Sequence, residues 1–224
     1  MIDLSKLSGL TLDELLTLKN SDKIVATLKR LLKEGHDDPS IHSALSKINF
    51  LKGNIKVAAE GFRCIGSKDP NNVLAHFELG ICEYYKANYD EAIHNFTHVI
   101  ELDRDYHMAK YWLGLCYFSL HDFSKVIEMH EPLMRHFPEW ASLLSYLGTA
   151  YEHTGKIQEA VSCFELMVER APSNAIAYYQ LGNLYLKKGD TISAIKVFRK
   201  GLGISPKSEL LMKAHSYVTD IDMP

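Results

Sequence analysis

Apolar and polar positions along the chain recur with a period of 34 residues. Four stretches open with the same Leu-Gly pair, whose leucines are Leu79, Leu113, Leu147 and Leu181. In each stretch apolar residues continue at helical spacing, and a short polar turn then precedes a second amphipathic segment. The pattern predicts repeated helix pairs, each of which needs its neighbours to bury its apolar face.

The prolines fix the frame of the repeat. They are Pro70, Pro138, Pro172 and Pro206, which differ by multiples of 34, and Arg104 takes the missing place in the series. This frame predicts five full units, at 39–72, 73–106, 107–140, 141–174 and 175–208. Residues 5–38 are interpreted as a degenerate unit whose first helix opens with a Thr11–Glu14 capping box. Residues 209–224 are interpreted as a capping helix and a tail.

Small residues mark where the two helices of a pair meet. The residue after the leucine that recurs in each unit is Ser46, Gly80, Gly114, Gly148 or Gly182. Glycine costs about 1 kcal/mol relative to alanine inside a helix, so its repetition indicates close approach of the second helix. That second helix carries an Ala–Phe pair in four units, at Ala58–Phe62, Ala92–Phe96, Ala160–Phe164 and Ala194–Phe198. The turns contain Gly53, Gly155 and Gly189 at one shared position, which predicts left-handed C-caps.

These features resemble the tetratricopeptide repeat (TPR) family over residues 39–208. The resemblance rests on the "LG..Y" of the first helix, the Ala–Phe pair of the second and the closing proline. It implies an all-α TPR solenoid of antiparallel helix pairs that form a right-handed superhelix, as one domain over 1–224. Asn49 and Glu83 depart from the family pattern where it has tyrosine, and His130 departs from it at a core aromatic.

The resemblance also implies that the first helix of each pair lines a concave groove. Residues two, five, six, nine, twelve and thirteen of each unit then face that groove. Aromatic side chains are common anchors in protein interfaces, although the same rings can pack between neighbouring helices. The groove residues predicted in this way are Phe77, Ile81, Tyr84, Met108, Tyr111, Trp112, Leu115, Phe118, Tyr146, Tyr179 and Asn183.

The distribution of charge along the chain indicates what kind of partner segment it attracts. Counted from the sequence, the net charge is +2 over 1–72, −8 over 73–174 and +3 over 175–224. The acidic middle favours a partner segment with basic flanks, and the alternation of sign also permits head-to-tail self-association. Many TPR co-chaperones hold a carboxylate with basic and amide side chains, but the matching positions here are mainly apolar or aromatic, with Ser142 in one frame and Gln180 in the next. The earliest possible frame starts at Ser43 and Lys47 but then meets Glu78, Met108 and Trp112. We therefore expect no chaperone carboxylate clamp.

Composition and motifs exclude several other classes. The net charge of −3 argues against nucleic-acid binding, and the longest apolar runs are too short to span a membrane. The N-terminus has no secretory pattern, and the four cysteines form no CxxC pair, so we expect a cytoplasmic protein. No catalytic motif occurs, and His94 with His98 gives only two candidate metal ligands. We expect neither catalysis nor a metal or cofactor.

Together these features predict a protein or peptide adaptor that binds an apolar or amphipathic segment. Two alternatives remain. One is a structural scaffold that assembles as a homo-oligomer, and the other is a regulatory TPR fragment of a larger enzyme.

Overall fold

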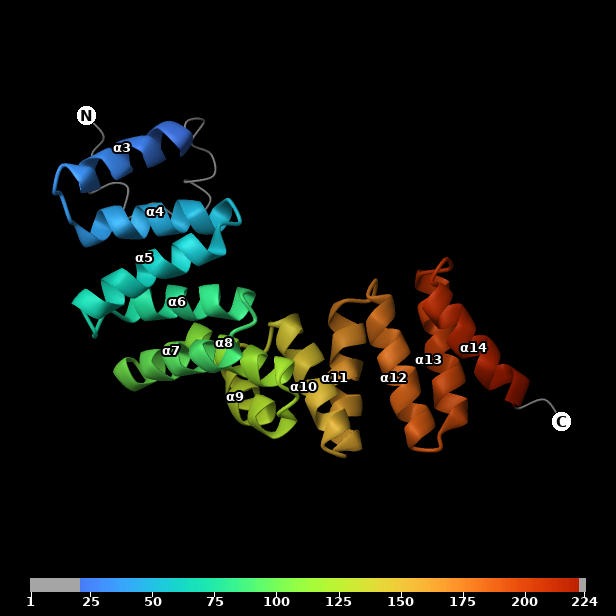
Figure 1. The fold of residues 1–224 in the computed structure, drawn as a ribbon. Helices are drawn as coiled ribbons and strands as arrows, with labels where there is room; N and C mark the ends of the chain where they lie inside the picture. Colours follow the sequence, from blue (N-terminus) through green and yellow to red (C-terminus); the bar gives the residue numbers. More distant parts are fainter. Residues whose placement is uncertain (1–20, 222–224) are drawn as a thin grey trace. The chain divides into compact units, whose positions relative to one another are not determined.

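The computed structural model describes residues 21–221, so the predicted Thr11–Glu14 capping box lies outside the described residues. Within this range the structure has twelve helices and no strand (Figure 1). They are α3 (Ser21–Lys33), α4 (Pro39–Leu51), α5 (Ile55–Lys68), α6 (Val73–Tyr85), α7 (Tyr89–Leu102), α8 (His107–Ser119), α9 (Phe123–His136), α10 (Ala141–His153), α11 (Ile157–Arg170), α12 (Ala175–Lys187), α13 (Thr191–Ile204) and α14 (Glu209–Ile221).

The chain divides into two compact units, Met1–Cys116 and Tyr117–Pro224, with the division inside α8. In unit 1, α4 packs on α5 and α6 packs on α7, while α5 and α6 join the two pairs. In unit 2, α10 packs on α11 and α12 on α13, and α14 packs against both α12 and α13. The predicted repeats 39–72, 73–106, 141–174 and 175–208 are thus helix pairs, and the all-α fold predicted from the 34-residue period is confirmed.

Glycine in the first helix lets the phenylalanine of the second helix approach it closely. A Cβ atom at Gly80 would lie 2.7 Å from the ring of Phe96. At Gly182 it would lie only 2.1 Å from the ring of Phe198. Real Cβ atoms do not approach other heavy atoms this closely, so the predicted reason for these glycines is confirmed.

The first full repeat reaches the same contact by a different arrangement. Its first helix carries the larger residue, Ser46, and its second helix carries Gly61 opposite it. A Cβ at Gly61 would lie 1.9 Å from the Ser46 hydroxyl oxygen. In this repeat the glycine of the contact therefore lies on the second helix, whereas Gly80 and Gly182 lie on the first helix of their repeats. The close approach of the two helices is preserved.

The turn inside each helix pair uses one left-handed residue. Gly53, Gly155 and Gly189 have φ of 78°, 78° and 76°, as predicted for C-cap glycines. The two equivalent residues without glycine, Ala87 and His121, adopt the same conformation, with φ of 57° and 59°. The repeat geometry thus imposes the left-handed turn even where the residue type does not favour it.

Candidate functional site

One row of exposed aliphatic side chains follows the repeat. The row, called here the position-two row, occupies the second residue of the first helix in successive repeats. Its exposed fractions are Leu74 46%, Met108 41%, Ile176 61% and Leu210 42%. Ser40 and Ser142 occupy this position in the other two full repeats. Leu74 and Met108 belong to unit 1, whereas Ile176 and Leu210 belong to unit 2. Each unit therefore exposes apolar side chains on its first helices, at the period of the repeat.

In unit 1 the predicted groove aromatics pack against one another. The Trp112 ring meets Tyr84 edge-on at a centroid distance of 5.2 Å, and its centroid lies 6.1 Å from that of Tyr85. On another side Trp112 stacks on the buried ring of Phe96 at 6.3 Å. Tyr84, Tyr111 and Trp112 are half-buried, and Tyr85 is exposed. These rings therefore form a platform that is partly core and partly surface.

Two residues predicted for the groove lie in the core of unit 1. Phe77 is only 8% exposed, because the rings of Phe96 and Tyr106 cover it at 5.9 and 4.9 Å. Leu115 is 7% exposed. Ile81 is half-buried and Met108 is exposed, so these two present apolar surface on the same side as the platform.

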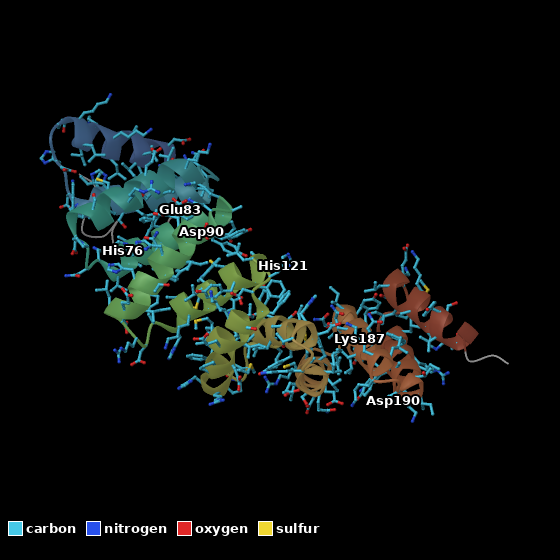
Figure 2. The ribbon with its side chains drawn as sticks, turned by 60° about the horizontal axis from the view of Figure 1, so that its bottom comes forward. His76, Glu83, Asp90, His121, Lys187 and Asp190 are labelled. Carbon is cyan, nitrogen blue, oxygen red and sulfur yellow. The ribbon has the colours of Figure 1, made fainter. Side chains whose placement is uncertain are left out.

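Helix α6 carries two carboxylates in different surroundings. Glu83 is fully buried and accepts hydrogen bonds from Arg63 at 2.7 Å, from Lys86 at 2.7 Å and from Asn88 at 3.1 Å (Glu83 is labelled in Figure 2). Burial by itself would raise the pKa of Glu83, but the hydrogen bonds from Lys86 and Asn88 and the nearby cationic charges bring it below its ordinary value. This carboxylate fills the tyrosine position of the repeat and is satisfied by its neighbours.

Glu78 lies on another face of the same helix and is half-buried. Burial raises the pKa of its carboxyl group above the ordinary value, and the charge of Lys47 opposes this shift only in part. Within residues 21–221 no hydrogen bond and no ion pair shorter than 4 Å reaches this carboxylate. The desolvation cost of Glu78 is therefore offset only in part, whereas hydrogen bonds and cations offset that of Glu83.

In unit 2 the inner helix faces line an open pocket of about 500 Å³. Its walls come from α12 and α14, and the lining residues are Tyr179, Asn183, Leu186, Leu210, Lys213, Ala214 and Tyr217. The repeat count predicts Tyr179 and Asn183 for the groove, and both line this pocket. Its lining is mainly apolar or aromatic, with one amide and one ammonium group as polar features.

The α14 side of this pocket was missed because 209–224 was interpreted only as a cap. A signal was present in the sequence. Counting two, five, six and nine residues into the next 34-residue period gives Leu210, Lys213, Ala214 and Tyr217. Helix α14 therefore presents its inner face in the same way as the first helix of a repeat.

The other predicted groove aromatics of unit 2 are partly used in packing. Phe118 meets Tyr146 edge-on at 5.0 Å and Phe123 at 5.8 Å, and both Phe118 and Tyr146 are half-buried against the core. His153 stacks on Phe123 at 4.2 Å. This part of the inner face is therefore a packed aromatic surface, whereas the α12–α14 part is open.

The described residues offer little chemistry beyond this. Across residues 21–221 no three His, Cys, Asp or Glu side chains gather closely enough to hold a metal ion. All four cysteines are free, and burial raises the pKa of Cys82 and Cys116 to about 12. None of the helices described here is long and apolar enough to cross a membrane.

Comparison with known proteins addresses the family directly. A family model described as tetratricopeptide repeat matches residues 143–174 and 175–208, and a second model with the same description matches residues 77–125. None of the curated protein sequences compared with the chain matches it.

Solved structures of other TPR proteins share the fold. The C-terminal part of a TPR repeat-containing protein from Cytophaga hutchinsonii is 17% identical with a TM-score of 0.80, and the match covers 98% of this chain and 89% of that one. YrrB, described as a TPR protein with an unusual peptide-binding site, is 18% identical with a TM-score of 0.75, covering 86% of this chain and 99% of that one. MamA from Desulfovibrio magneticus RS-1 is 18% identical with a TM-score of 0.72, covering 77% and 98%. From its repeats, its helix pairs and these matches, the chain belongs to the tetratricopeptide repeat family.

Proposed function

We propose that this chain is a non-catalytic adaptor that binds an apolar or amphipathic segment of a partner protein along its inner helix faces. The observation that carries the proposal is the position-two row. Leu74, Met108, Ile176 and Leu210 expose aliphatic side chains at one repeat position, on both units. Exposed apolar side chains that recur on the first helices within a unit commonly mark a protein interaction site.

The α12–α14 pocket supports the same proposal. Its volume of about 500 Å³ lies within the range typical of ligand pockets, roughly 300–1,000 Å³. Tyr179 and Tyr217 supply large apolar area with few rotatable bonds, which suits an anchor for a partner side chain. The Asn183 amide can both donate and accept hydrogen bonds, which suits the backbone of an extended or helical segment.

The structural relatives are consistent with this function but do not identify a ligand. The name given to YrrB includes a peptide-binding site, and at 18% identity that likeness concerns the fold alone. Four free cysteines suit a reducing compartment, so we place the adaptor in the cytoplasm.

The experiment that tests the proposal compares inner and outer apolar residues of the same type. Dodecapeptides are selected from a random display library on the wild-type chain, and the affinities of the selected peptides are then measured on single variants. Ile176→Ser on α12 has a matched control in Ile192→Ser on α13, since the two side chains are 61% and 67% exposed. Leu74→Ser on α6 has a similar control in Leu102→Ser on α7.

We expect the inner substitutions to weaken binding about tenfold, which corresponds to the loss of one buried aliphatic contact, and the outer ones to leave it unchanged. Equal effects of inner and outer substitutions would move the binding surface away from the first helices. Light scattering at several protein and salt concentrations, without peptide, separates this adaptor from a self-assembling scaffold. An adaptor keeps one mass throughout.

A further inference from the structure

The inner face of α6 combines exposed apolar residues with one acidic residue. Leu74, Glu78, Ile81 and Tyr85 follow one another at spacings of four, three and four residues, so they form one stripe along the helix. Leu74 and Tyr85 at its ends are exposed, and Glu78 and Ile81 between them are half-buried. The carboxylate therefore lies inside the apolar stripe.

Glu78 is unusual for its repeat position. The sixth residue of the other full repeats and of α14 is Ala44, Trp112, Tyr146, Gln180 or Ala214, and none of these carries a charge. A half-buried carboxylate costs stability unless hydrogen bonds or an opposite charge compensate for the lost hydration. Packing of the repeat does not require an acid here, because the other repeats do without one.

Glu83 shows how this helix satisfies a carboxylate that serves the fold. Two cations and an amide reach Glu83 within 3.1 Å, and its pKa falls below the ordinary value. Glu78 has no such partner among the described residues, and its pKa is raised by burial. The nearest opposing influence is Lys47 of α4, which acts on Glu78 only through its field and forms no ion pair with it.

We propose that Glu78 is a recognition site for a Lys or Arg side chain of the bound partner segment. This inference rests on the proposed adaptor function and names the chemistry of its ligand within unit 1. The aliphatic stem of the Lys or Arg lies along Leu74 and Ile81, and its cationic group pairs with the Glu78 carboxylate. Tyr85, at the end of the stripe, offers an exposed ring to the same cation.

The acidic charge of the region supports this choice of ligand. Residues 73–116 of unit 1 hold seven acidic and three basic side chains, a net charge of −4, which attracts cationic segments and repels anionic ones. A partner cation would also supply the compensation that Glu78 lacks in the chain alone. Pairing with a partner cation would therefore also offset the desolvation cost of the Glu78 carboxylate.

The test uses the same random dodecapeptide library, selected in parallel on the wild-type chain, on Glu78→Gln and on Glu60→Gln. Glu60 is an exposed carboxylate on α5 of the same unit, so its variant makes the same change in net charge away from the inner face. The consensus peptide from wild type is then synthesised with its basic residue as Arg, as Lys and as citrulline, which keeps the shape of Arg without the charge.

We expect Arg or Lys at one fixed position of the wild-type consensus. Citrulline and Glu78→Gln should each weaken binding about tenfold or more, the range for a charge-assisted hydrogen bond, and Glu60→Gln should not. Combining citrulline with Glu78→Gln should cost little beyond either change alone. Thermal unfolding provides an independent readout. The melting temperature of Glu78→Gln should equal that of wild type or exceed it. If Glu78 instead stabilised the fold, Glu78→Gln would melt at a lower temperature than wild type.

The outcomes separate the two proposals. If wild type selects peptides without a basic position, or if their affinity is unchanged in Glu78→Gln, the assignment of Glu78 is wrong. Binding on the inner helix faces is then still decided by the Leu74→Ser and Ile176→Ser variants and their controls. If wild type selects no peptide at all, the adaptor function itself fails. A consensus that matches this chain's own sequence would make a second copy the occupant and overturn the partner protein as ligand.

Discussion

Unit 1 and unit 2 are built from the same repeat, but they fill its inner face differently. In unit 1 the rings of Tyr84, Tyr85 and Trp112 lie in contact with one another, with centroids 5.2–6.1 Å apart. In unit 2 the rings of Tyr179 and Tyr217 line a pocket of about 500 Å³. The first arrangement uses aromatic area largely for packing, and the second keeps it available to a ligand.

The two units also differ in how they fill positions inside the helix pair. At the tyrosine position of the repeat, unit 2 has Tyr117, Tyr151 and Tyr185. Unit 1 has Asn49 and Glu83 there, and two cations hold Glu83. At the close helix contact, unit 2 keeps glycine in the first helix, whereas unit 1 once moves it to Gly61 in the second. The repeat geometry therefore tolerates exchange of the residues that maintain it, provided that volume and charge are compensated locally.

The largest effect should come from the charged tyrosine position of unit 1. Glu83→Ala leaves Arg63 and Lys86 without their shared anion and opens a cavity, so it should lower the free energy of unfolding by about 3 kcal/mol. The counterpart in unit 2, Tyr185→Phe, removes a single exposed hydrogen bond to Glu165 and should cost about 1 kcal/mol or less. Denaturant unfolding measures both values, and hydrogen exchange assigns each loss to its unit.

The pH dependence of the free energy of unfolding provides a second test of the role of Glu83. Its folded-state pKa is lowered, so its stabilising contribution is present in full above the ordinary carboxyl pKa of about 4.3 and disappears as pH falls through the lowered value. The difference between wild type and Glu83→Ala should therefore shrink below about pH 4. A difference that stays constant down to acid pH would show that Glu83 acts through its volume and not through its charge.

The sequence predicted the close helix contacts because their cause is local and repeated. Gly80, Gly148 and Gly182 each face a phenylalanine of the same repeat, so one steric rule explains all three. Exposure on the inner face does not follow in this way. The period placed Phe77 on that face, but Phe96 and Tyr106 of the same repeat cover its ring. Sequence spacing gives the direction of a side chain, and it does not give the depth to which its neighbours bury it.

The polar parts of the site were the least predictable. The repeat count marked Glu78 as inward-facing, but its lack of a partner depends on where Lys47 and the nearby rings lie in space. The α12–α14 pocket was only half predicted, because Tyr217 and Leu210 come from α14, which lies beyond the last full repeat. Such features require the three-dimensional contacts between repeats.

An intermediate effect is expected from filling the glycine positions. Gly182→Ala would place a Cβ 2.1 Å from the fully buried Phe198 ring, and overpacking of this kind costs up to about 3 kcal/mol. The higher helix propensity of alanine offsets about 1 kcal/mol of this cost. We therefore expect Gly182→Ala to lower the free energy of unfolding by about 2 kcal/mol.

The matched variant in unit 1 is Gly61→Ala. The Ser46 hydroxyl that it would meet can rotate away, so the free energy of unfolding should change by less than about 1 kcal/mol. Both values come from the same denaturant experiment. If Gly61→Ala proved as costly as Gly182→Ala, the exchange of Ser46 and Gly61 between helices would be as tightly packed as the Gly–Phe contact.

The smallest effect concerns the left-handed turn, which each unit contains once without glycine. Ala87 in unit 1 and His121 in unit 2 hold φ near +58°, where a side chain with a Cβ is strained by about 1 kcal/mol or more. Glycine removes that strain but gives the unfolded chain more freedom, so Ala87→Gly and His121→Gly should each stabilise the chain by about 0.5 kcal/mol. The reverse change at an equivalent turn, Gly155→Ala, should cost about 1 kcal/mol. The melting temperatures of the three variants test this prediction. A loss of stability in Ala87→Gly or His121→Gly would mean that contacts of the original side chain outweigh the backbone strain. The two units would then no longer share one rule for this turn.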